Sequence, residues 1–127
     1  MRHVFVMLTM TAFLVAPYAA LSKGLKAHQL FAICKEGASE TQLQQCESYV
    51  LGWRDSFRAA NLFRDGGSAG KALNNPKMDI CLSDGNYEKT KMVLALRRYL
   101  ANNPQYMNKT STTVTIMAMR EVFPCKR

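Results

Sequence analysis

A seam of apolar side chains between residues 43 and 60 constrains the fold more than any other feature of the chain. Its members recur at alternating spacings of three and four residues, which places them on one face of an α-helix. The seam consists of Leu43, Cys46, Val50, Trp53, Phe57 and Ala60. Ser39 and Gln42 precede it at the spacing of a capping box, so a long helix is predicted to begin there. We expect this seam, widened by Tyr49 and Phe63, to pack in the core; a ligand-binding face is the alternative.

Gly52 lies inside the predicted long helix. Glycine lowers the stability of a helix by about 1 kcal/mol relative to alanine. Because it lacks a β-carbon, it also allows another backbone to approach closely. A close contact between the long helix and a second helix is therefore predicted at this position.

Three further segments have helical periodicity. Residues 25–36 form a first short helix that ends before Gly37. Residues 87–102 form a third helix that ends before Pro104, and a fourth runs from a cap at Thr110 or Ser111 to about residue 122. Residues 65–79 contain three Gly, one Pro and two Asn, so we expect a loop there with at most one turn of helix, over residues 69–73. No segment has the clear alternation of a strand. The predicted fold is all-α: a small disulfide-stapled bundle of about four main helices.

The first 22 residues have the organisation of a secretory signal peptide. A basic start at Arg2 precedes a mostly apolar run over residues 4–15, and small residues follow Pro17. This run is shorter than the roughly 20 residues that span a bilayer, which disfavours the alternative of a membrane anchor. We therefore expect residues 1–22 to be a cleaved signal peptide and residues 23–127 to form a single helical domain. Cleavage there removes one basic and no acidic residue, so the net charge falls from +8 to +7.

All four cysteines lie beyond the predicted signal peptide, and an even number in an exported chain indicates two disulfides. They are Cys34, Cys46, Cys81 and Cys125. Three pairings are possible, and the spacing alone does not select one. Buried free thiols or a metal site are the alternatives. The chain has no CxxC motif and only His28 as a histidine beyond the signal peptide, so no metal site is predicted.

The motifs of common enzyme classes do not occur in the sequence. Neither HExxH nor GxSxG is present, and His28 has no cysteine free to act as a nucleophile beside it. Residues 65–72 approach a phosphate-binding loop but have Asp65 where the motif needs Gly and Ala72 where it needs Ser or Thr. Asp79 and Asp84 form an acidic pair at a turn, where Asp is expected for its bonds to the backbone. We expect neither an enzyme nor a bound cofactor.

The net positive charge favours an anionic partner. Lys and Arg residues are dispersed along the chain, without the interleaved aromatic residues that stack on bases. Nucleic-acid binding is therefore not expected, and neither is stable membrane insertion once the signal peptide has been removed. By elimination, the predicted function is the binding of a macromolecule in the cell envelope.

Five short motifs together resemble a known family. They are Leu30-x3-Cys34, Cys46-x2-Tyr49-Val50-x-Gly52-x2-Asp55, Ile80-Cys81-Leu82, Val93-x6-Leu100-x3-Pro104 and Phe123-Pro124-Cys125. In this order they are similar to the type VI secretion amidase immunity proteins, the Tai/Rap family of small exported helical proteins. The resemblance covers about residues 24–125. The chain lacks the proline that often follows Cys81 in the family, which leaves its branch and its cognate toxin open.

The resemblance implies a periplasmic immunity protein that binds a peptidoglycan amidase with a cysteine nucleophile, occludes its active site and protects the cell from self or sister intoxication. It also implies a homodimer. Surplus apolar side chains on the long helix could supply the subunit interface: Leu51, Phe57, Leu62 and Phe63. The disulfides are then expected to be Cys34–Cys46 and Cys81–Cys125. The alternative function is a small periplasmic helical chaperone or an acid-stress or structural protein.

The amidase-binding surface is predicted at the loop that follows the long helix. A polar element that protrudes from a rigid scaffold is suited to blocking a cleft, because the scaffold lowers the cost of ordering it. The candidate residues are Arg64, Asp65, Ser68, Lys71, Asn74, Asn75 and Lys77. Arg97 and Arg98 on the third helix are the next candidates, as charges at the rim that accelerate association.

Overall fold

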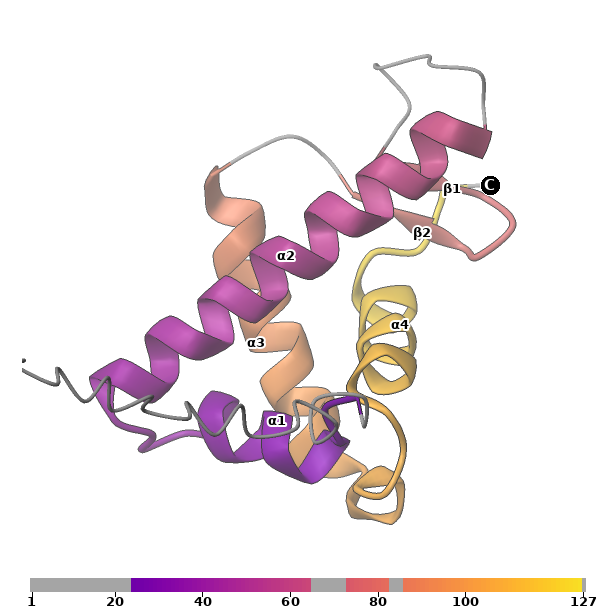
Figure 1. The fold of residues 1–127 in the computed structure, drawn as a ribbon. Coiled ribbons are helices and arrows are strands. Elements are labelled where there is room, and N and C mark those ends of the chain that lie inside the picture. Colours follow the sequence, from indigo (N-terminus) through magenta and orange to yellow (C-terminus); the bar gives the residue numbers. More distant parts are fainter. Residues whose placement is uncertain (1–23, 65–72, 83–85, 127) are drawn as a thin grey trace, which may run out of the picture.

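The computed structural model describes residues 24–64, 73–82 and 86–126. Its elements are α1 (Ala27–Cys34), α2 (Glu40–Arg64), β1 (Asn74–Asn75), β2 (Ile80–Cys81), α3 (Asn86–Asn102), a 3-10 helix η3 (Pro104–Tyr106) and α4 (Ser111–Val122). Figure 1 shows α2 running obliquely across α3, with α4 beside α3 and α1 at their lower end. Within these described residues, the predicted all-α bundle with four main helices is confirmed. The expected signal peptide, residues 1–22, lies outside the described residues.

The start of α2 matches the predicted capping box. The backbone N–H of Ser39 donates to Oε1 of Gln42 at 2.9 Å, and the backbone N–H of Gln42 donates to Oγ of Ser39 at 3.3 Å. Three members of the apolar seam are buried: Cys46, Val50 and Phe57. Trp53 is half-buried and Ala60 is exposed, so only part of the seam lies in the core.

The close helix contact predicted at Gly52 is not found. A β-carbon added to Gly52 would have no atom of another described element within 4 Å, so nothing in the described part of the chain requires a glycine there. Gly37, just after α1, is different, because its φ of 76° is a left-handed conformation that favours glycine. It allows the chain to turn between α1 and α2.

The core is built from all four helices. Leu30 of α1, Val50 of α2, Leu96 of α3 and Val114 of α4 are each fully buried. The N-terminus of α1 is also tied to the start of α4 through the backbone. The N–H of Ala27 accordingly donates to the carbonyl of Lys109 at 2.9 Å, and that of Ser111 donates to the carbonyl of Leu25 at 2.8 Å. The cap of α4 is Thr110, whose Oγ1 accepts from the N–H of Thr113 at 3.3 Å.

Two disulfides are present, in the pairing predicted after the family resemblance. Cys34–Cys46 joins the end of α1 to α2. Cys81–Cys125 joins β2 to the C-terminal segment. The two bonds use all four cysteines of the chain.

Residues 74–81 correct one expectation, since the sequence predicted no strand. β1 and β2 form a short antiparallel pair in which Asn74 lies opposite Cys81 and Asn75 opposite Ile80. Two residues per strand are too few to produce a visible alternation of apolar and polar positions. The turn of helix expected over residues 69–73 falls mostly on residues 69–72, outside the described part of the chain.

Candidate functional site

The β1–β2 hairpin is fixed to the C-terminal segment. The backbone N–H of Cys81 donates to the carbonyl of Phe123 at 2.9 Å, next to the disulfide between Cys81 and Cys125. The backbone N–H of Cys125 donates to Oδ1 of Asp79 at 3.2 Å. Asp79 has a φ of 54°, a left-handed conformation that Asp tolerates better than most residues. The hairpin and the C-terminal segment therefore form one unit beside the end of α2 (Figure 1).

Asn75 anchors the hairpin to α2 from the inside. Its side chain is 6% exposed, and its amide nitrogen donates to Oδ1 of Asn61 on α2 at 3.1 Å. Its amide oxygen accepts from the backbone N–H of Met78 at 3.2 Å. The sequence placed Asn75 among the residues that meet a partner. Its burial and these two hydrogen bonds give it a role in positioning the hairpin, and its contact with a partner stays a prediction.

A basic pocket opens where α2, the hairpin and the C-terminal segment meet. Its volume is about 670 Å³. We call it the hairpin pocket, and it is lined by Arg64, Asn74, Pro76, Lys77, Cys81, Cys125 and Lys126. Three of these side chains are cations and none is acidic. The pocket is therefore suited to an anionic or acidic group of a binding partner.

The structure brings together three of the residues predicted to bind the amidase. Arg64, Asn74 and Lys77 all line the hairpin pocket, although ten residues or more separate Arg64 from the others in sequence. Asp65, Ser68 and Lys71 lie outside the described residues. The positions of these three therefore stay predictions.

Lys126 is a residue of this pocket that the sequence analysis missed. It follows Cys125 directly, so the disulfide to Cys81 brings it beside the hairpin. The predicted pairing of these cysteines was the signal that could have found it. Phe63, next to Arg64 at the end of α2, is 91% exposed and adds a large apolar side chain near the same end of the molecule.

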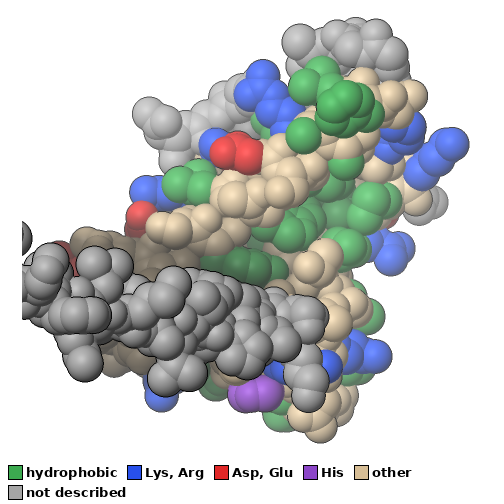
Figure 2. Space-filling model, in the orientation of Figure 1, with side chains coloured by type: hydrophobic (Ala, Val, Ile, Leu, Met, Phe, Trp, Pro, Cys, Tyr) green, Lys and Arg blue, Asp and Glu red, His purple; other side chains and the backbone are tan. Residues whose placement is uncertain are grey.

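An uncharged groove runs along the face that α2 shares with α4. Its volume is about 630 Å³. We call it the α2–α4 groove, and it is lined by Ser48, Tyr49, Gly52, Trp53, Ser56, Phe57, Ala60, Met78, Thr112 and Ile116. The rings of Trp53 and Phe57 stack within it, with their centroids 5.2 Å apart. Figure 2 shows apolar side chains gathered between α2 and α4 on this face.

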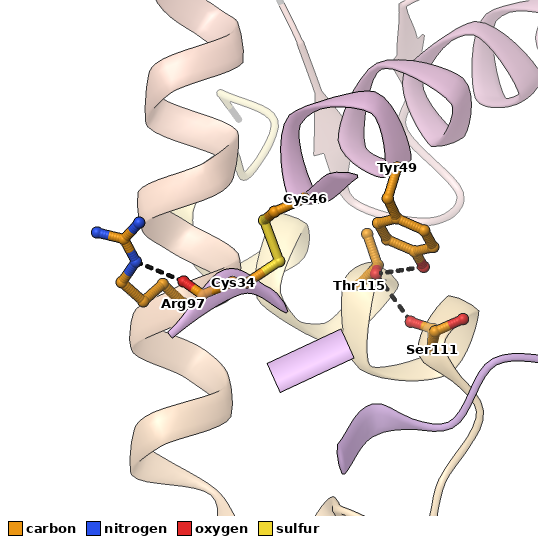
Figure 3. Close-up of a disulfide and its surroundings, with 6 residues drawn as sticks. All are labelled: Cys34, Cys46, Tyr49, Arg97, Ser111 and Thr115. Carbon is orange, nitrogen blue, oxygen red and sulfur yellow. Dashed lines mark hydrogen bonds between the residues drawn. A yellow bond between two sulfur atoms is a disulfide. The ribbon is translucent and has the colours of Figure 1, made fainter. Parts of the chain in front are cut away.

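The two arginines predicted as secondary candidates lie on α3 and line a third pocket, described below, rather than the hairpin pocket. Arg97 is half-buried and its Nε donates to the carbonyl oxygen of Cys34 at 2.6 Å (Figure 3). Arg98 is exposed. They face a different part of the surface from Lys77 and Lys126.

Among residues 24–64, 73–82 and 86–126, no three His, Cys, Asp or Glu side chains are grouped so that they could hold a metal ion. None of the helices in the described part is both long and apolar enough to cross a membrane. His28 lies at the surface, with Nδ1 3.3 Å from the carbonyl oxygen of Met107.

The helical bundle and its two disulfides define a small disulfide-bonded helical protein with a basic surface pocket. The chain belongs to the family of Rap1a immunity proteins, whose family model matches residues 26–125. This match confirms the resemblance found in the sequence and indicates an immunity protein of the type VI effector class. No curated protein and no solved structure matched the chain.

Proposed function

We propose that this protein is a periplasmic immunity protein that binds a type VI-secreted peptidoglycan amidase and occludes its active site. It thereby protects the cell from self or sister intoxication, acts without a cofactor and is not itself an enzyme. The match to the Rap1a immunity proteins over residues 26–125 is the observation that carries this proposal. The surfaces described above supply the physical means of binding.

The hairpin pocket and the chain that precedes it form the proposed amidase-binding surface. Arg64, Lys77 and Lys126 present positive charge there, which attracts an acidic rim on a partner and accelerates association. The disulfide at Cys125 and the inward contacts of Asn75 hold the hairpin in place before binding. A surface that is already ordered loses less conformational entropy when the complex forms.

Export through the signal peptide at residues 1–22 is part of the same proposal. The toxin acts on peptidoglycan, so its inhibitor must be in the same compartment. Two disulfides are typical of proteins that fold in the oxidising periplasm. Mass spectrometry of the protein recovered from the periplasm tests this, because the mature chain should begin near residue 23.

A homodimer through the α2–α4 groove completes the proposal. None of the ten residues that line this groove is charged, whereas the exported chain would have a net charge of +7. Two copies therefore repel each other least when these uncharged faces meet. Of the apolar side chains first assigned to the interface, Phe57 is buried, Leu51 and Leu62 are half-buried, and Phe63 is exposed. Light scattering that gives only the monomer mass at micromolar concentration would contradict the dimer.

The central experiment compares a charge-reversed hairpin pocket with a matched control. The double variant Lys77→Glu/Lys126→Glu should inhibit the purified amidase at least about tenfold less, which corresponds to about 1.4 kcal/mol. Arg120→Glu reverses a cation on α4 that is also exposed but lies outside the pocket, and this variant should inhibit normally. Thermal unfolding of all three proteins shows whether the variants fold alike.

Two results of this experiment would contradict different parts of the proposal. If the unaltered protein forms no tight 1:1 or 2:2 complex with the amidase, immunity through binding fails. Weak binding to many unfolded proteins would then favour the chaperone. If the unaltered protein inhibits and the double variant inhibits equally well, the hairpin pocket is not the inhibitory surface.

A further inference from the structure

A second basic pocket lies between the C-terminal end of α1 and α3. Its volume is about 480 Å³. We call it the Arg97 pocket, and it is lined by Phe31, Lys35, Glu36, Leu94, Arg97, Arg98 and Ala101. Three of these side chains are cations and one is acidic, so the pocket has a net positive charge. It shares no lining residue with the hairpin pocket or the α2–α4 groove.

The guanidinium group of Arg97 is positioned by a single hydrogen bond from its Nε atom. Its Nε donates to the carbonyl oxygen of Cys34 at 2.6 Å. Cys34 is fully buried and is joined to Cys46, so this acceptor is fixed by the disulfide between α1 and α2. Figure 3 shows the two terminal nitrogens of Arg97 directed away from Cys34. Within the described part of the chain, the bond to Cys34 is the one hydrogen bond that the Arg97 side chain makes.

This arrangement leaves the two terminal nitrogens of Arg97, a residue that lines the pocket, without a hydrogen-bond partner among the described residues. The terminal nitrogens of a guanidinium group match the two oxygens of a carboxylate and bind it through two parallel hydrogen bonds. Because the group is already ordered by Cys34, little further conformational entropy is lost when it binds. The contact to Cys34 by itself satisfies a carbonyl at the end of α1. That structural role uses Nε and leaves the terminal nitrogens available.

The other residues of the pocket indicate which groups would lie beside a carboxylate bound by Arg97. Leu94 is 50% exposed and Phe31 is half-buried, so apolar surface lies beside the guanidinium group. The volume falls in the range of ligand-binding clefts and exceeds what one small anion would fill. A free phosphate ion would leave Leu94 and Phe31 uncovered. A peptide that carries an acidic side chain between apolar residues would cover both.

We propose that the Arg97 pocket binds a Glu or Asp side chain of a partner protein, flanked by apolar residues, through paired hydrogen bonds from the terminal nitrogens of Arg97. Lys35 and Arg98 attract the acidic segment, and Leu94 and Phe31 contact its apolar neighbours. This site goes beyond the proposed amidase inhibition and does not rest on it. The probes below contain no amidase, so each proposal can fail without the other.

The test is a titration of the oxidised protein with two short peptides, followed by NMR of the arginine side chains. The peptides are acetyl-Leu-Glu-Leu-amide and acetyl-Leu-Gln-Leu-amide, which differ only in the carboxylate. The Glu peptide should shift the side-chain signals of Arg97 and bind at least about tenfold more tightly than the Gln peptide. Arg97→Lys keeps the charge but removes the planar fork, so it should also weaken binding of the Glu peptide at least about tenfold.

Arg98→Gln is the matched control, because it removes an adjacent cation from the same pocket and leaves the guanidinium group of Arg97 unchanged. At about 0.15 M salt it should weaken binding less than about threefold. If Arg97→Lys fails to fold, Leu94→Ser at a half-exposed position tests the apolar contact and should weaken binding of the Glu peptide. Equal binding of the two peptides, or an equal effect of Arg98→Gln and Arg97→Lys, would overturn the proposal. So would inorganic phosphate that binds as tightly as the Glu peptide.

Discussion

The phenol oxygen of Tyr49 on α2 lies 2.9 Å from the hydroxyl oxygen of Thr115 on α4. Thr115 in turn donates to the carbonyl oxygen of Ser111 at 2.8 Å (Figure 3). A hydroxyl group has one hydrogen to donate, so Tyr49 must be the donor in its bond to Thr115. Because Thr115 is fully buried, this is a polar link between α2 and α4 within the bundle.

Tyr49→Phe should therefore lower the free energy of unfolding by about 1 kcal/mol, since the bond is lost while the ring still packs. Urea denaturation of the oxidised protein measures the change. Tyr106→Phe is the control, because the Tyr106 hydroxyl makes no hydrogen bond to another described residue. Its ring stacks on Tyr99 and lies 5.5 Å from Nζ of Lys109, and a phenylalanine ring keeps both contacts. An equal loss in both variants would show that the link between Tyr49 and Thr115 contributes nothing specific.

The helices could be predicted because their signals are local. The start of α2 depends on Ser39 and Gln42, three residues apart, and the start of α4 depends on Thr110 and Thr113. The apolar seam correctly predicted that α2 is a helix, but it did not predict which seam side chains are buried. Trp53 and Ala60 lie in the α2–α4 groove, because the neighbouring helices cover only part of that face.

The hairpin and its pocket could be predicted only in part. The Gly- and Asn-rich composition placed a loop after α2, but the inward direction of Asn75 depends on Asn61, fourteen residues earlier. Lys126 reaches the pocket through the disulfide at Cys125, which joins segments 44 residues apart. Contacts between such distant segments leave no periodic pattern in the sequence, so a residue-by-residue analysis does not show them.

The two disulfides should contribute unequally to stability. They close segments of 12 and 44 residues. The loss of chain entropy in the unfolded state then predicts that each bond stabilises the protein by about 3 and about 4 kcal/mol, respectively. Denaturation of the Cys34→Ala/Cys46→Ala and Cys81→Ala/Cys125→Ala variants measures both. The Cys81→Ala/Cys125→Ala variant should also inhibit the amidase less than the Cys34→Ala/Cys46→Ala variant does, because Cys125 holds the C-terminal segment at the hairpin. If both variants stay within about 0.5 kcal/mol of the parent, the cross-links do not act through chain entropy.

Two glycines should respond in opposite directions to alanine. Gly52→Ala should raise the free energy of unfolding by up to about 1 kcal/mol, because the new β-carbon meets no atom and alanine favours a helix. Gly37→Ala should lower it by about 1–2 kcal/mol, because the φ of 76° is strained for a residue with a β-carbon. Both are measured by denaturation at high dilution, where association does not contribute. A destabilising effect of Gly52→Ala would mean that the position is not open as described.

The hairpin contains residues that hold it in place and residues proposed to contact the partner, and paired substitutions should distinguish the two roles. Asn75→Asp keeps an oxygen for the N–H of Met78 but cannot donate to Asn61, so it should lower the free energy of unfolding by about 1–3 kcal/mol.

Lys77→Ala changes an exposed side chain and should alter stability by no more than about 0.5 kcal/mol. Its effect should instead appear as weaker inhibition of the amidase, with a slower association rate that depends on salt. Denaturation and stopped-flow binding of the two variants distinguish these roles. If Lys77→Ala binds at the normal rate while Asn75→Asp is fully stable, the assignment of holding and contacting residues is wrong.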